Sequence, residues 1–228
     1  MQNSLSLTFV RGDDRTQNNV AVNRLVIAGW TGRDPDLVES HIRELENLGV
    51  PRPPTTPVFY RASASRLTCA STIEVVGENS GGEVEFVLLG TGSRLWVGVG
   101  SDHTDRAAET YNVTVSKQMC EKPLAPVFWD FEEVVPHWDR LILRSWVEEN
   151  GARTPYQDGA VSAMLTPADL LARWSEAGTL DEGTLMFCGT LPAIGGVRPT
   201  GSFEFALEDP VLKRKIEHRY EVLKLAIQ

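Results

Sequence analysis

Cysteine is scarce in this chain of 228 residues, and its scarcity excludes two kinds of structure. The three cysteines, Cys69, Cys120 and Cys188, are odd in number, far apart and without CxxC spacing. Neither a disulfide framework nor a zinc site is therefore expected. The chain also lacks a hydrophobic run of membrane-spanning length, and its start, MQNSLSLTFV, lacks the basic and long apolar segments of a signal peptide. We expect a cytoplasmic protein.

Basic residues are also few. Lysine and arginine number 22 against 31 aspartates and glutamates, which gives a formal net charge of -9. This balance argues against nucleic acid or an anionic membrane as the main partner, because both favour basic surfaces. The sequence has no phosphate-binding glycine loop, GxSxG nucleophile elbow, internal repeat or low-complexity tract. With 42% hydrophobic residues it can bury a sizeable core, and we interpret residues 1–228 as one domain that begins with a strand region at 1–23.

The stretch of residues 81–106, GGEVEFVLLGTGSRLWVGVGSDHTDR, contains the main candidate site. Glu83 and Glu85 are two residues apart in a strand-like run, so both carboxylates should project to the same side. A second strand-like run follows a glycine-rich turn, and a hairpin would bring Asp102 back towards the two glutamates. Three converging carboxylates form the all-oxygen ligand set that magnesium, manganese or calcium prefers. The alternative is an ordinary half-exposed strand with a solvated acidic face.

A histidine and a glutamate form a second candidate group. His41 and Glu44 are three residues apart on one face of a predicted helix at 36–48. Such a pair is usually a surface pair on an amphipathic helix, but it can also act as a general base, with Glu44 orienting His41 or a bound water. Lys117 ends a weakly alternating run at 112–116. It is either solvated or, beside a metal and a carbonyl substrate, a proton donor or an enolate stabiliser.

Hydrophobic patterning predicts a chain rich in strands. Residues 121–136 contain prolines and aromatics, which fits a packed loop or a partner contact. Residues 213–225 fit a strand or a helix. A second helix is expected at 166–174, with Thr166 as its cap and Pro167 at its first position. The predicted strands are residues 5–10, 24–28, 57–60, 71–76, 83–88, 95–99, 112–116, 141–148, 185–188 and 202–207.

The order of these motifs resembles that of the fumarylacetoacetate hydrolase (FAH) family. The motifs are an HxxE helix, a proline-rich loop leading to PVFYR, then GEVEF, DHTDR, SKQ, YQDG and a terminal GT loop. The chain resembles in particular the short members that act as acylpyruvate hydrolases, oxaloacetate decarboxylases and isomerases of ring-cleavage products. It is also similar to a branch known mainly as a domain of unknown function. The resemblance covers roughly residues 25–197.

The resemblance implies a β-rich α+β fold in which a rolled mixed sheet, a β-roll or β-sandwich, carries few helices. By analogy with the family, the aromatic and proline-rich residues 129–138 make a homodimer the expected assembly. The roles implied for individual residues are metal ligation by Glu83, Glu85 and Asp102, catalysis by His41, Glu44 and Lys117, and substrate binding by Arg106, Gln157 and Thr190.

The chain departs from the family pattern at several positions. Trp30 and its neighbours stand where the family has Asn-Tyr before the histidine, and Ala107 replaces the aspartate that follows the motif arginine. The family's GTP loop becomes GTLP, starting at Gly189, and its Gly-Asp before the last buried strand becomes Gly-Thr at Gly183. These departures leave the metal site in place and the substrate open.

The implied function is a divalent-metal-dependent hydrolase or lyase. It would use Mg²⁺ or Mn²⁺, with Ca²⁺ as an alternative, to break a C–C bond in a small 2-oxo acid or acylpyruvate-like catabolic intermediate. Activated water leads to hydrolysis, whereas exclusion of water leads to decarboxylation or isomerisation. Two alternatives stay open: a metal-dependent hydrolase of an amide or lactone, and a ligand-binding relative that retains the metal site without catalysis.

Overall fold

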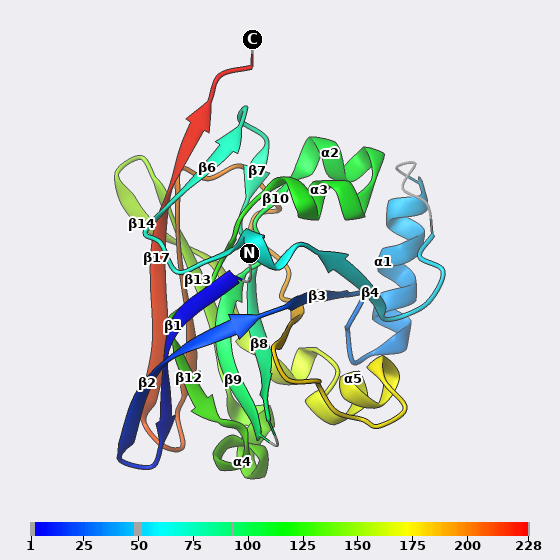
Figure 1. Ribbon diagram of the computed structural model, residues 1–228. Coiled ribbons are helices and arrows are strands. Elements are labelled where there is room, and N and C mark those ends of the chain that lie inside the picture. The colour runs from blue at the N-terminus through cyan, green and yellow to red at the C-terminus, as the bar shows by residue number, and fades with distance from the viewer. Residues whose placement is uncertain (1–2, 48–51, 93, 228) are drawn as a thin grey trace.

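Two mixed β-sheets form the body of the protein (Figure 1). The computed structural model describes residues 3–47, 52–92 and 94–227, without the side chains of Asn3, Glu44 and Leu45. The larger sheet has eight strands in the order β2-β1-β12-β9-β8-β15-β3-β4, and the smaller has five in the order β14-β13-β16-β17-β6. Parallel pairs, such as β1 with β12 and β15 with β3, lie among antiparallel ones. The chain therefore has the β-rich α+β fold that was predicted, with a curled mixed sheet.

The elements have the following bounds. The large sheet contains β1 (Asn3–Arg11), β2 (Asp14–Val22), β3 (Arg24–Gly29), β4 (Val58–Ala62), β8 (Val84–Thr91), β9 (Arg94–Ser101), β12 (Val127–Asp130) and β15 (Thr184–Thr190). The small sheet contains β6 (Thr72–Val76), β13 (Ile142–Glu149), β14 (Ala152–Ala160), β16 (Ser202–Asp209) and β17 (Arg214–Leu225). Two short pairs are β7 (Ser80–Gly81) with β10 (Thr104–Asp105), and β5 (Leu67–Thr68) with β11 (Lys122–Pro123).

Helices gather on one side of the large sheet. In Figure 1, α1, α2, α3 and α5 lie beside β4 and β8, on the side away from β17. Their bounds are α1 (Pro35–Asn47), α2 (Arg106–Tyr111), α3 (Val113–Met119), α4 (Phe131–Val134) and α5 (Pro167–Trp174), and the 3-10 helices are η1 (Ala64–Arg66), η2 (Val135–Arg140) and η3 (Val161–Ala163). No helix in the described ranges is both long enough and apolar enough to cross a membrane.

Strand β8 lies between two hydrophobic clusters. Phe86 and Leu88 belong to the cluster that includes Phe203 of the small sheet, whereas Val87 and Leu89 belong to a second cluster inside the curl of the large sheet. Both faces of β8 are therefore buried, so the alternative of a half-exposed strand with a solvated acidic face is wrong. Alternation along the strand directs its odd-numbered side chains into the curl.

Most predicted elements correspond to observed ones within a few residues, and two predictions are wrong. The run at 112–116 is not a strand, because Asn112 caps α3 by accepting a hydrogen bond from the Val115 N–H at 3.0 Å. Residues 121–136 are not a loop throughout, since β12 lies within them and pairs with both β1 and β9. The ambiguous run at 213–225 is a strand, β17, which pairs with β16 and β6. The predicted end of the first helix at residue 48 lies outside the described residues.

Candidate metal centre

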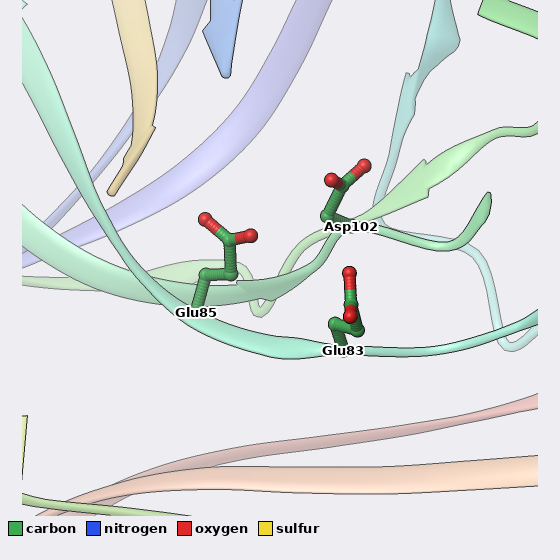
Figure 2. A group of neighbouring side chains, drawn as sticks. All are labelled: Glu83, Glu85 and Asp102. Carbon is green, nitrogen blue, oxygen red and sulfur yellow. The ribbon is translucent and has the colours of Figure 1, made fainter. Parts of the chain in front are cut away.

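The three predicted carboxylates meet at the open end of the β8–β9 hairpin. Val84 pairs with Ser101, and the Asp102 N–H donates to the Glu83 carbonyl at 2.9 Å, so the strands bring Glu83 and Asp102 opposite each other. One oxygen from each of Glu83, Glu85 and Asp102 lies within 4.8 Å of the others. Figure 2 shows the two glutamates rising from one stretch of chain towards the side where Asp102 lies.

The separation of these oxygens fits a single hard cation. Oxygens bound to one Mg²⁺, Mn²⁺ or Ca²⁺ at about 2.0–2.6 Å lie about 3–5 Å from one another. Glu85 and Asp102 are buried, whereas the side chain of Glu83 is 18% exposed. Glu85 and Asp102 are therefore shielded from solvent, whereas Glu83 lies on the side of the group that solvent reaches.

The electrostatics of Glu85 also fit a cation. Burial raises the pKa of Glu85 well above its usual value, and the nearby charge of Asp102 raises it further. One carboxylate oxygen accepts a hydrogen bond from the Gly189 N–H at 2.6 Å, which offsets part of this effect. A divalent cation between the two carboxylates would remove their repulsion and keep both ionised.

Two lysines contact Asp102. The Lys117 ammonium, on α3, reaches Oδ2, and the Lys122 ammonium, on β11, lies 2.9 Å from Oδ1. Burial alone would raise the pKa of Asp102, but these two cations outweigh it and lower the pKa. Lys117 is 8% exposed and its pKa is raised, because the neighbouring carboxylates outweigh the burial that lowers it. Lys122 is fully buried, and this burial lowers its pKa.

Lys122 is a site residue that the sequence did not reveal. It lies in the segment interpreted as a loop, and nothing in CEKPL marks a lysine that is removed from water. Its burial follows from tertiary structure, because β11 pairs with β5 and directs the side chain towards Asp102. The only signal for Lys122 in the sequence is its position, since it follows the DHTDR motif five residues after Lys117.

Arg106 lies at the solvent side of the group. Its guanidinium is 3.3 Å from a Glu83 oxygen and 2.9 Å from a Glu109 oxygen. Arg106 also lines a cavity of about 430 Å³ together with Arg198. The predicted substrate-binding arginine therefore contacts the carboxylate group and also lines an open cavity.

Gln157 and Thr190 lie close to β8 and tie strands together. Gln157 Oε1 accepts from the Val84 N–H and the Ser145 hydroxyl, both at 2.9 Å, and its amide nitrogen donates to Thr190 Oγ1 at 2.7 Å and to the Leu191 carbonyl at 2.6 Å. Thr190 Oγ1 donates to the Val84 carbonyl at 2.7 Å. These contacts use the full hydrogen-bonding capacity of the Gln157 amide, so Gln157 holds β8 in place. Substrate binding by Gln157 and Thr190 stays a prediction.

The predicted catalytic pair lies on α1. His41 is exposed, and its ring centroid is 5.8 Å from that of Trp30. The side chain of Glu44 lies outside the part of the chain that the structure describes. The structure thus brings together Glu83, Glu85, Asp102, Lys117 and Arg106, and the role of His41 and Glu44 stays a prediction.

Comparison with known proteins identifies a family and a fold. The model of the family DUF2848, described as a protein of unknown function, matches residues 28–220. No curated protein matches the chain.

Solved structures of FAH-superfamily enzymes share the fold. A fumarylpyruvate hydrolase from Pseudomonas aeruginosa, in complex with Mn²⁺ and pyruvate, is 18% identical with a TM-score of 0.63, and the match covers 98% of this chain and 97% of that one. A 2-keto-3-deoxy-D-arabinonate dehydratase, complexed with magnesium and 2,5-dioxopentanoate, is 14% identical with a TM-score of 0.65, and the match covers 95% of this chain and 79% of that one. At these identities the likeness shows the fold alone.

Proposed function

Since the chain belongs to the DUF2848 family and has the FAH fold, we propose that it is a divalent-metal-dependent enzyme acting on a small 2-oxo acid. The observation that carries the proposal is the convergence of Glu83, Glu85 and Asp102 within 4.8 Å, in the position that the motif order predicts. The proposed reaction is cleavage of a C–C bond, by hydrolysis of an acylpyruvate-like compound or by decarboxylation.

The proposed ion is Mg²⁺ or Mn²⁺, held by the three carboxylates. When bound, such an ion polarises a carbonyl oxygen and stabilises negative charge that develops beside it. Two solved structures with this fold carry Mn²⁺ or magnesium together with a small oxo compound, which supports both the ion and the substrate class.

Arg106 and Arg198 are the groups proposed to bind the substrate carboxylate. Both line the cavity of about 430 Å³, and a guanidinium matches a carboxylate with two parallel hydrogen bonds. A cavity of this size suits a small acid. Binding there would place the oxo end of the acid towards the carboxylate group, because Arg106 contacts Glu83.

Lys117 is proposed to serve the reacting atoms directly. The Lys117 side chain is buried, and its ammonium contacts Asp102 and lies 5.8 Å from the centre of the Tyr60 ring. A raised pKa keeps it charged, so it stabilises negative charge on the substrate through hydrogen bonds that Nζ donates. If His41 and Glu44 reach the site and activate water, the outcome is hydrolysis. If they do not, decarboxylation is favoured.

Activity assays test the proposal. The purified protein, supplied with Mg²⁺ or Mn²⁺, should turn over acylpyruvates or oxaloacetate, lose activity in EDTA and regain it with added metal. Glu83→Gln should lower kcat/KM by about 100-fold or more, because it removes a charged metal ligand. Glu204→Gln is the matched control, since it breaks a carboxylate–arginine pair with Arg153 on the small sheet and leaves the three carboxylates intact. Turnover that is indifferent to EDTA and to Glu83→Gln would contradict the proposal.

We further propose that the protein is cytoplasmic and a homodimer. In the aromatic and proline-rich segment 129–138, Trp129 and Trp138 are buried in the chain's own core, whereas Val135 is exposed. The dimer proposal rests on analogy with the family.

A further inference from the structure

The hydroxyl of Tyr220 lies between the two residues that flank Asp102. It is 2.9 Å from the Ser101 hydroxyl and 2.8 Å from His103 Nδ1, and all three side chains are fully buried. Tyr220 comes from β17 of the small sheet, whereas Ser101 ends β9 of the large sheet. The Tyr220 hydroxyl, from the small sheet, therefore contacts the residue before Asp102 and the residue after it.

The hydrogen bonds continue to the strand that precedes Glu83. His103 Nε2 is 2.9 Å from the hydroxyl of Ser80, which is buried in β7. Both ring nitrogens of His103 are thus used, Nδ1 by Tyr220 and Nε2 by Ser80, and a neutral imidazole supplies one donor and one acceptor. Ser80, His103, Tyr220 and Ser101 can then form one chain in which each donor meets an acceptor, in either direction.

Tyr220 also packs against the residue before Glu83. A Cβ atom at Gly82 would lie 2.7 Å from the Tyr220 hydroxyl and 2.7 Å from Cγ of Phe203. Only glycine lets the chain pass this close to the two rings without a shift. The same tyrosine thus contacts the two peptide segments that carry Glu83 and Asp102.

We propose that Tyr220 is a positioning residue for the candidate metal centre. Its hydroxyl fixes the segments Gly81–Gly82–Glu83 and Ser101–Asp102–His103 relative to each other, and this sets the separation of the carboxylate oxygens. The inference rests on the proposed function and extends it, because it assigns control of metal affinity to a strand of the other sheet. Groups that orient metal ligands typically change the affinity 10- to 100-fold when they are removed.

The test compares two tyrosines that differ in this contact. Tyr220→Phe removes only the hydroxyl. Tyr156→Phe is the matched control, because Tyr156 is equally buried, packs on the same Phe203 at 5.8 Å and accepts only a 3.3 Å hydrogen bond from the Arg198 N–H. Isothermal titration with Mn²⁺ measures the Kd of the full-length wild type and both variants, and thermal unfolding measures their stability.

We expect Tyr220→Phe to raise the Kd for Mn²⁺ by about 10-fold or more, and Tyr156→Phe to change it by less than about 3-fold. Equal Kd values for the two variants would overturn the inference while leaving the metal centre intact. Absence of Mn²⁺ binding by the wild type would instead overturn the proposed function. If Tyr220→Phe does not fold, Ser101→Ala removes one of the same hydrogen bonds. It should raise the Kd by about 3-fold or more, and an unchanged Kd would overturn the inference.

Discussion

Asp102 supplies the negative charge that balances the two lysines of the site. It lies between two ammonium groups, of which that of Lys122 is fully buried, and it is itself fully buried. Removing one partner of a buried ion pair leaves the other charge without compensation, which costs far more than the pair contributes when intact. Asp102 should therefore matter for folding even without metal.

Substitution of Asp102 tests this dependence. We expect Asp102→Asn to lower the free energy of unfolding by about 3–5 kcal/mol in EDTA, measured by urea denaturation, because Lys117 and Lys122 lose their counter-charge. The control is Asp158→Asn, which removes a 52% exposed carboxylate paired with Arg144 and should cost less than about 1 kcal/mol. Equal losses in the two variants would show that the buried pairs do not have this role.

His103 makes stability depend on pH. Its pKa in the folded protein is about 3, lowered by burial and by Lys122 and Arg106, whereas an unfolded histidine titrates near 6.5. Between these values the unfolded state binds more protons than the folded state, so stability rises with pH across this window and falls on acidification. The stabilising contribution is present above pH 6.5 and is lost progressively below it.

Urea denaturation at pH 7 and pH 5 measures this effect. From the two pKa values, His103 accounts for a loss of about 2 kcal/mol between these pH values. His103→Gln keeps a polar side chain but cannot titrate, so its stability should fall by about 2 kcal/mol less over the same interval. Parallel pH dependence in wild type and variant would contradict the assignment.

At the scale of single residues, the three carboxylates of the site could be predicted from the sequence. Glu83 and Glu85 could be placed on one side of a strand from alternation, and Asp102 could be returned to them by a hairpin. Lys122 and Tyr220 could not be found in this way. Their side chains reach the site because separate strands, β11 and β17, meet the β8–β9 hairpin, and such long-range pairing leaves no local pattern in the sequence.

At the scale of elements, the β8–β9 hairpin was predictable and α3 was not. The hairpin has alternating apolar residues and a glycine turn, with Gly92 at φ 57°. The run VTVS after Asn112 alternates as a strand does, but the asparagine caps a helix, and local capping prevailed over the β-branched pattern. As a result Lys117 lies on the helix α3, in which it and Ser116 are the buried residues.

Strand β15 contributes the backbone N–H of Gly189 as a hydrogen-bond donor to Glu85, at a position where only glycine fits. Gly189 has φ 102°, its N–H bonds Glu85, and a Cβ atom there would lie 1.7 Å from Thr31 Oγ1. We expect Gly189→Ala to destabilise the protein by about 3 kcal/mol or more and to abolish Mn²⁺ binding, measured by denaturation and calorimetry.

Gly178→Ala is the control for this substitution. Gly178 also has positive φ, 61°, but no atom lies within 4 Å of an added Cβ. It should cost about 1 kcal/mol and leave the Kd for Mn²⁺ unchanged. Equal losses of stability and equal Kd values in the two variants would show that the close approach of Gly189 to Thr31 and its hydrogen bond to Glu85 do not determine stability or Mn²⁺ binding.

At the scale of the whole molecule, hydrophobic patterning predicted a chain rich in strands, and the family resemblance implied the curled mixed sheet. Neither source gave the strand order. Parallel pairing of β1 with β12 and of β3 with β15 joins residues more than 100 positions apart. Within the predicted strand region at 1–23, β2 was not recognised as a separate strand, because it is an edge strand whose residues up to Asn19 are polar and exposed.

The assembly is a prediction at the same scale. We expect light scattering on the eluting protein to give twice the 25.2 kDa mass of the chain, because a homodimer is proposed from the family resemblance. A mass that stays at one chain from micromolar to tens of micromolar protein would contradict the proposal and leave the metal centre unaffected.

The location of a bound metal ion tests the central claim most directly. Crystals of the wild type grown with Mn²⁺ should give an anomalous difference peak within about 2.5 Å of one oxygen from each of Glu83, Glu85 and Asp102. Crystals of Asp102→Asn under the same conditions should lack that peak. An ion found elsewhere, or none beside these carboxylates at saturating Mn²⁺, would contradict the account.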